Sequence, residues 1–140
     1  TEGGLDVASQ SAVLETVVGR LADAGIRVSM FIDPDKAQID ASMAIGAPVI
    51  ELHTGGFAEL SDQVAAAREV ERIAGAAAYA KKKGLKVNAG HGLHYHNVQA
   101  IASISEIGEL NIGHAIIAQA IFSGLTGAVQ EMKRLMLAVR

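Results

Sequence analysis

Two glycine–histidine pairs stand in similar settings along this sequence, and both could do chemistry. Residues 88–91 (NAGH) and 111–114 (NIGH) share the pattern N-x-G-H, and each pattern closes a short strand-like run. An imidazole exchanges protons near neutral pH, so His91, with a glycine on either side, is a candidate acid–base group. A glycine that opens a helix exposes backbone N–H groups, so Gly113 and His114 form a candidate anion cradle. The simpler interpretation of each pair is a tight turn.

Polar side chains also interrupt the apolar runs themselves. Strand alternation places Glu51 on the opposite face from Ile50 and Leu52. Asn88 and Asn111 likewise stand among apolar neighbours. Burying a carboxylate and two amides is costly unless they find partners, so we expect these three residues to line a polar site. The alternative is that they satisfy one another as structural hydrogen bonds.

Other catalytic and metal-binding patterns are weaker. His94 and His96 would give three imidazoles together with His91, but this spacing is common by chance and no carboxylate lies nearby in sequence. We expect a surface loop of hydrogen-bonded histidines there and no metal site. The sequence has no cysteine, which excludes disulfides and thiolate metal sites. It also has no G-x-S-x-G elbow, G-x-G-x-x-G fingerprint or Walker loop.

The elements that must position these residues alternate between strands and helices. Short apolar runs closed by polar residues or glycine predict buried strands at 28–32, 48–53, 86–89 and 110–112. Helical spacing predicts helices at 9–24, 35–45, 59–83, 97–104, 115–123 and 126–138, the last two divided near Gly124. Asp33-Pro34 is expected to cap the second helix, and Gly25 to end the first.

This alternation indicates βαβ units, a parallel sheet and the α/β fold class. Ligands bind at the carboxyl ends of the strands in such folds. If the strands align, one rim of the sheet carries Asp33, Glu51, His53, His91 and His114.

Composition narrows the class of protein. A chain of 140 residues, half of them hydrophobic, predicts one domain over 1–140 with a core built mainly from aliphatic side chains, because only five residues are aromatic. A net charge of −3 gives no electrostatic footprint for nucleic acid. No apolar run is long enough to span a bilayer and no signal peptide is visible, so we expect a cytoplasmic protein without a membrane partner. The chain starts at Thr1 rather than at Met, so the natural start is expected to precede it.

Several long motifs resemble pyridoxine 5′-phosphate synthase. They are residues 1–7 (TEGGLDV), 28–33, 50–55, 86–97 (KVNAGHGLHYHN), 109–117 (ELNIGHAII) and 131–136. The resemblance implies a (β/α)8 (TIM) barrel. It also implies a transferase that condenses 1-deoxy-D-xylulose 5-phosphate with 3-amino-2-oxopropyl phosphate, forming pyridoxine 5′-phosphate, phosphate and water. No metal or organic cofactor is implied.

The resemblance also implies roles for individual residues. His91 corresponds to the catalytic proton donor, and Glu51 to the carboxylate that stabilises the transition state. Gly92, Gly113 and His114 correspond to contacts with the aminooxopropyl phosphate. Thr1 corresponds either to the threonine that contacts the deoxyxylulose phosphate or to its immediate neighbour.

The family chain is much longer, and this one matches its C-terminal part, strands five to eight. We therefore expect half of a barrel that is inactive without an N-terminal half as its partner. Open sheet edges predict that the chain is not stable as a monomer, and complete barrels of the family form homo-oligomers, namely octamers. The rival hypothesis is a non-catalytic phosphate-binding half-barrel. An aldolase or isomerase barrel is a further alternative, although a Schiff-base aldolase is disfavoured because Lys86 stands at the start of a strand.

Overall fold

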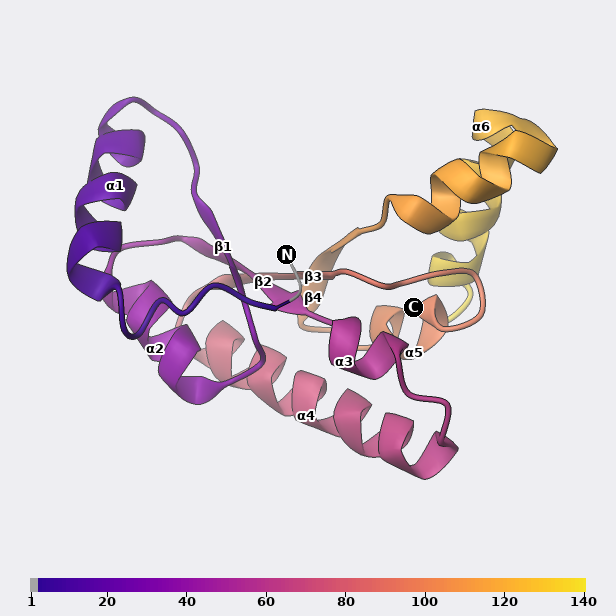
Figure 1. Ribbon diagram of the computed structural model, residues 1–140, viewed down its shortest axis with the longest axis horizontal. Coiled ribbons are helices and arrows are strands. Elements are labelled where there is room, and N and C mark those ends of the chain that lie inside the picture. Colours follow the sequence, from indigo (N-terminus) through magenta and orange to yellow (C-terminus); the bar gives the residue numbers. More distant parts are fainter. Residues whose placement is uncertain (1–2) are drawn as a thin grey trace.

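Strands and helices alternate along the chain in the computed structural model, which describes residues 3–140. The helices are α1 (Ser11–Asp23), α2 (Lys36–Ala44), α3 (Gly55–Ala58), α4 (Gln63–Lys82), α5 (Val98–Ala102) and α6 (His114–Leu137). The strands are β1 (Ser29–Ile32), β2 (Val49–His53), β3 (Lys86–Gly90) and β4 (Ile107–Asn111). Figure 1 shows the four strands meeting at the centre, with α1 and α6 at opposite ends.

The strands form one parallel sheet in the order β1-β2-β3-β4. Each pair of neighbouring strands is connected through at least one helix, as βαβ units require. The register places Phe31 of β1, Glu51 of β2, Asn88 of β3 and Glu109 of β4 at one level across the sheet. The predicted parallel α/β arrangement is therefore confirmed, and all four strands end at the same rim.

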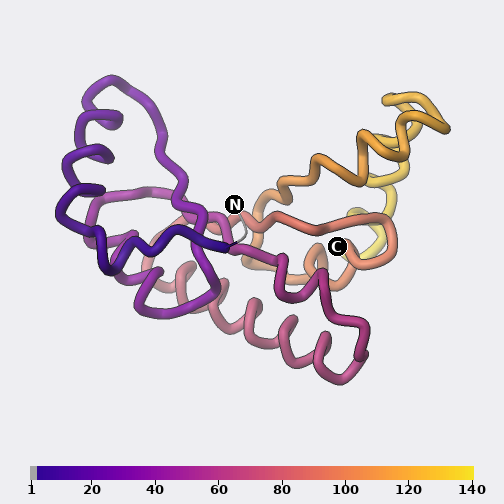
Figure 2. Tube along the Cα trace, in the orientation of Figure 1, coloured from indigo at the N-terminus to yellow at the C-terminus, as the bar shows by residue number. Residues whose placement is uncertain are grey.

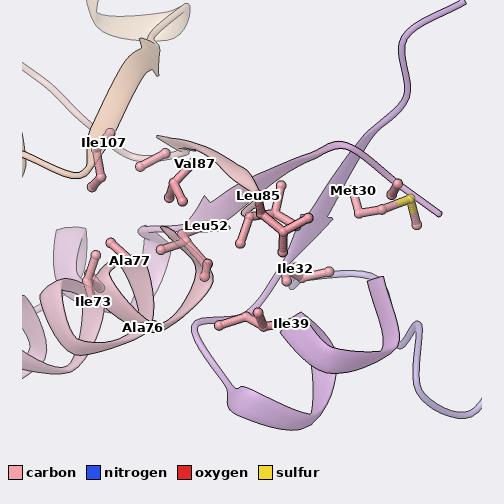
Figure 3. Close-up of a cluster of buried hydrophobic side chains, with 14 of the residues drawn as sticks. Met30, Ile32, Ile39, Leu52, Ile73, Ala76, Ala77, Leu85, Val87 and Ile107 are labelled. Atoms are coloured by element: carbon pink, nitrogen blue, oxygen red, sulfur yellow. The ribbon is translucent and has the colours of Figure 1, made fainter. Parts of the chain in front are cut away.

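One face of the sheet builds the hydrophobic core. Ile32, Ile50, Leu52 and Ala89 are fully buried on it. Figure 3 shows how strand side chains of this face meet those of α2 and α4, with Ile39 and Ile73 among them. Fully burying a side chain of this kind stabilises the fold by about 1.5–3 kcal/mol. The helix-covered face therefore contains the main hydrophobic cluster of the described residues.

The start of the fourth strand and the cap of the second helix differ from the prediction. The fourth strand runs from Ile107 to Asn111 rather than over 110–112, and the ladder between β3 and β4 has an irregularity at Val87/Asn88. Helix α2 is capped by Asp35, whose carboxylate accepts bonds from the N–H groups of Ala37 and Gln38, rather than by Asp33-Pro34. A carboxylate at this position satisfies N–H groups that the first helical turn leaves free.

The C-terminal helix changes direction at one glycine. Gly124 has φ 73° and ψ 156°, which are not helical values, and it divides α6 where the sequence predicted a break. Figure 2 shows the trace of α6 turning back near its middle. Glycine adopts this positive φ without a steric penalty, and Gly25 does the same after α1.

The long α4 starts later than predicted. The sequence suggested a helix from 59, but the short helix α3 ends at Ala58 and α4 begins after its cap, Asp62. Within residues 3–140, no helix combines the length and the apolar character needed to cross a membrane.

Candidate active site

Five of the six residues to which the family resemblance assigns roles gather around one cavity of about 560 Å³ at the carboxyl ends of the strands. This rim cavity is lined by Phe31, Glu51, His91, Gly92, Gly113 and His114, together with residues 93–94, 111–112 and 115. Thr1, the remaining candidate, lies outside the described residues. Topology explains the convergence, because β2, β3 and β4 are adjacent and end at the same rim.

Glu51 is half-buried on the face of β2 opposite the core. Its Oε2 accepts a hydrogen bond of 2.7 Å from Nδ2 of Asn111, which lies sixty residues further along the chain. Gly90 makes room for this pair, because a Cβ at that position would lie 2.5 Å from Oε1 of Glu51 and 2.8 Å from the carbonyl oxygen of Asn111. The hydrogen bond therefore orients the carboxylate, which lines the same cavity as His91.

Asn88 lies at a different place from the one expected. Its Nδ2 donates to Oε1 of Glu109 at 3.2 Å, and both residues line a separate cavity of about 190 Å³. Each of the two amides thus has its own carboxylate partner, and only the Glu51–Asn111 pair borders the rim cavity. Glu109 was not among the predicted site residues, because the fourth strand was expected to start beyond it.

His91 has a backbone conformation that side chains rarely adopt. Its φ is +82°, the only positive φ outside glycine among residues 3–140. Such a conformation costs about 1–3 kcal/mol and persists when the surroundings hold it. Gly92, the next residue, has φ +75°, and a Cβ there would lie 2.5 Å from Cβ of Ala58. The strained turn presents the imidazole of His91, which is exposed, to the rim cavity.

A third cavity, of about 530 Å³, is also bordered by His91. This side cavity is lined by Gly3, Asp33, His53, residues 55–56, Glu59, Arg72 and His91. Nδ1 of His53 lies 3.2 Å from Oδ1 of Asp33, and the ring centroids of His53 and His91 are 4.9 Å apart. The sequence prediction that Asp33, His53 and His91 share a rim is confirmed, with His91 bordering both cavities.

Arg72 brings a positive charge to the side cavity. Its guanidinium donates from Nε and Nη2 to the carboxylate of Glu69 and from Nη1 to the carbonyl oxygen of Pro34. The hydrogen bonds that Arg72 donates to Glu69 raise the pKa of Arg72 above its ordinary value, and the nearby charges of Asp33 and Asp35 act in the same direction. The side cavity therefore contains a permanent cation facing carboxylates.

Gly113 and His114 open the last helix at the edge of the rim cavity. Gly113 is the N-cap of α6 and His114 its first residue, and no side chain caps this end. The first N–H groups of a helix have no partner within the helix, and they carry a partial positive charge. This end of α6 can therefore accept an anion such as a phosphate group.

The histidines of the following loop were expected at a surface. The expectation is confirmed for His96, which is exposed and whose N–H donates to Nδ1 of His94 at 3.2 Å, but His94 itself is half-buried and lines the rim cavity. The loop is anchored by Tyr95, whose hydroxyl donates to the carbonyl oxygen of Ala128 at 2.9 Å. Over residues 3–140, no three histidine or carboxylate side chains are grouped closely enough to hold a metal ion.

These arrangements can do acid–base chemistry on a phosphorylated molecule. An imidazole and an oriented carboxylate share a cavity with an uncapped helix end. A comparison with protein-family models agrees with this chemistry: the model described as "Pyridoxal phosphate biosynthesis protein PdxJ" matches residues 1–138. The matched range includes every residue that lines the two cavities.

Proposed function

The chain belongs to the PdxJ family, an enzyme family of vitamin B6 biosynthesis, and we propose that its rim cavity is part of the active site of a pyridoxine 5′-phosphate synthase. The proposed substrates are 1-deoxy-D-xylulose 5-phosphate and 3-amino-2-oxopropyl phosphate. The single observation that carries the proposal is the convergence of Glu51, His91 and the uncapped start of α6 on one cavity.

Proton transfer is the task proposed for His91. Joining an amine to a sugar carbonyl through a Schiff base releases water, and closing the pyridine ring eliminates water and phosphate. Each departing oxygen needs a proton. A histidine can supply it near neutral pH, and its glycine neighbours allow substrate to approach closely. The exposure of the imidazole to the cavity supports this role.

Glu51 is proposed to stabilise the positive charge that develops on nitrogen during the condensation. A carboxylate that is already oriented needs no reorganisation as the charge forms. The hydrogen bond from Asn111 and the absence of a side chain at Gly90 support such preorganisation.

Binding of the aminooxopropyl phosphate is proposed for Gly92, Gly113 and His114. The free N–H groups at the start of α6 suit a phosphate, and a fixed phosphate would hold the amine near His91. Thr1, or a residue next to it, is proposed to contact the sugar phosphate.

The four strands are proposed to be a segment of a (β/α)8 barrel, equivalent to strands five to eight. Strands β1 and β4 each have one neighbouring strand within the described residues, so each has an outer edge that a further strand could pair, and at the β1 edge the N–H of Leu5 already donates to the carbonyl oxygen of Phe31. Further strands at both edges would enclose the polar face that carries Glu51. The proposed catalyst is therefore the complete barrel, associated into larger homo-oligomers.

The experiment measures formation of pyridoxine 5′-phosphate by the complete barrel that contains these residues, with each substrate omitted in turn. Glu51→Gln should lower kcat about 10²–10³-fold, because it removes the charge and keeps an acceptor for Asn111. Glu109→Gln is the matched control, since Glu109 pairs with Asn88 away from the rim cavity. Phosphate binding without any product would favour the non-catalytic alternative.

A further inference from the structure

The backbone of His91 is held from β2 by one buried hydroxyl. Thr54 follows β2 directly and is fully buried. Its N–H donates to the carbonyl oxygen of Gly90 at 2.8 Å. Its Oγ1 lies 2.8 Å from that same oxygen and 2.6 Å from the carbonyl oxygen of His91, so the hydroxyl proton is shared between two carbonyls. These bonds attach the left-handed turn of His91 to a neighbouring strand.

The ring of His91 is supported by the residue before Thr54. The His53 ring lies 4.9 Å from that of His91 and meets Phe31 edge-on at 5.1 Å. Asp33 stands 3.2 Å from Nδ1 of His53, while Nε2 is buried and has no hydrogen-bond partner within the described part of the chain. Gly55 leaves the space for this contact, because a Cβ there would lie 2.6 Å from Nε2 of His53.

We propose that His53 and Thr54 are positioning residues that fix the backbone and the ring of His91 for proton transfer. This inference rests on the proposed function of His91. Thr54 holds the turn in the conformation that aims the imidazole at the rim cavity. His53, held by Asp33 and Phe31, limits the rotation of that imidazole. Thr54 is fully buried and therefore acts only through the turn, while His53 lines the side cavity and not the rim cavity, with its Nε2 covered.

The test for Thr54 compares its loss with the loss of another buried hydroxyl, so that an effect on the position of His91 can be distinguished from an effect on stability. Ser42 and Thr54 are the two fully buried polar residues within 3–140, and the Ser42 hydroxyl bonds to the carbonyl oxygen of Gln38 inside α2. In the complete barrel, Thr54→Val should lower kcat about 10- to 100-fold, with KM nearly unchanged. Ser42→Ala should lower the thermal midpoint and leave kcat unchanged, and Thr54→Ser should recover most of kcat.

A Thr54→Val enzyme with the kcat of the parent would overturn the role of Thr54. Equal losses in Thr54→Ser and Thr54→Val would also overturn it, because packing of the methyl group would then be responsible. His53→Phe keeps an aromatic ring and removes both nitrogens. This variant should lower kcat, because the contact with Asp33 that holds the ring is lost. An unchanged kcat would show that His53 contributes packing only, and would overturn its positioning role.

The inference and the proposed function fail in different ways. If the parent barrel makes no product, the proposed function fails. The backbone NMR signals of His91 and Gly92 then still report whether Thr54 holds the turn. They should shift in Thr54→Val and not in Ser42→Ala, and identical spectra in Thr54→Val and the parent would overturn the inference.

Discussion

The two faces of the sheet are built from the same strands and have opposite properties. On the helix-covered face, Ile50 and Leu52 are fully buried in the main hydrophobic cluster. On the other face, Glu51 is half-buried and bonded to Asn111, and neither belongs to that cluster. Because side chains alternate along a strand, residues that stabilise the fold and residues proposed to do chemistry are direct neighbours in sequence. Substitutions on the two faces should therefore change different measurable quantities.

The largest effect on stability is expected on the covered face. Ile50→Ala removes a side chain that is 0 % exposed and should lower the free energy of unfolding by about 2–5 kcal/mol. Ile26→Ala is the matched control, because Ile26 is 52 % exposed and its loss should change stability by about 0.5 kcal/mol or less. Urea titration of the complete barrel measures both, and kcat of the folded fraction should stay the same. Equal stability losses would contradict the division between the faces.

On the polar face, Gly90→Ala should damage activity more than stability. The new Cβ would crowd Oε1 of Glu51 and the backbone of Asn111, and a displacement of about 1 Å at a catalytic group costs on the order of 10²-fold in rate. Gly108→Ala is the control, since a Cβ there meets only the carbonyl oxygen of Val87, at an ordinary 3.8 Å. Steady-state kinetics of the two variants should differ strongly. Similar kcat values would show that the close approach at Gly90 has no role in the site.

The smallest effect is expected at the surface between α2 and α4. There the hydroxyl of Tyr79 donates to the carboxylate of Asp40, and this bond, with a smaller contribution from Lys83, lowers the pKa of Asp40 below its ordinary 3.8. A lowered carboxyl pKa stabilises the fold above the ordinary value, and the gain is lost as the pH falls through the lowered pKa. Tyr79→Phe should therefore reduce the difference in unfolding free energy between neutral pH and pH values below 3.8.

Tyr95→Phe provides the control for this pH dependence. The Tyr95 hydroxyl donates to a backbone carbonyl, that of Ala128, which does not titrate. Its loss should lower stability equally at all pH values. Parallel pH profiles for the two variants would contradict the assignment of the Asp40 pKa to Tyr79.

Local patterns in the sequence predicted most of the helices and strands, and most of the residues that line the candidate site. Apolar runs identify the strand that ends at Ile32 and the strand within 48–53. The two N-x-G-H patterns mark the ends of β3 and β4. The start of β4 was missed because Gly108 and Glu109 interrupt its apolar run, and because the irregular pairing with β3 depends on a strand far away in sequence. The short helix α3 leaves no periodic pattern in four residues.

Local patterns could not predict the contacts between segments that are far apart in the sequence. Nothing near Thr54 indicates that its hydroxyl meets the carbonyls of Gly90 and His91, because those partners are 36 and 37 residues away. The bond between Asn111 and Glu51 spans 60 residues and depends on the strand register. The sequence could therefore predict which side chains gather at the rim of the sheet, but not which contacts orient them.

The most direct test of the central claim is kcat of His91→Asn in the complete barrel. Asparagine tolerates a positive φ better than most residues, so this variant removes the imidazole without adding strain to the turn. The account predicts that kcat falls about 10²–10⁴-fold, while KM and the thermal midpoint change little. A kcat equal to that of the parent enzyme would contradict the proposal that the polar face provides the proton donor.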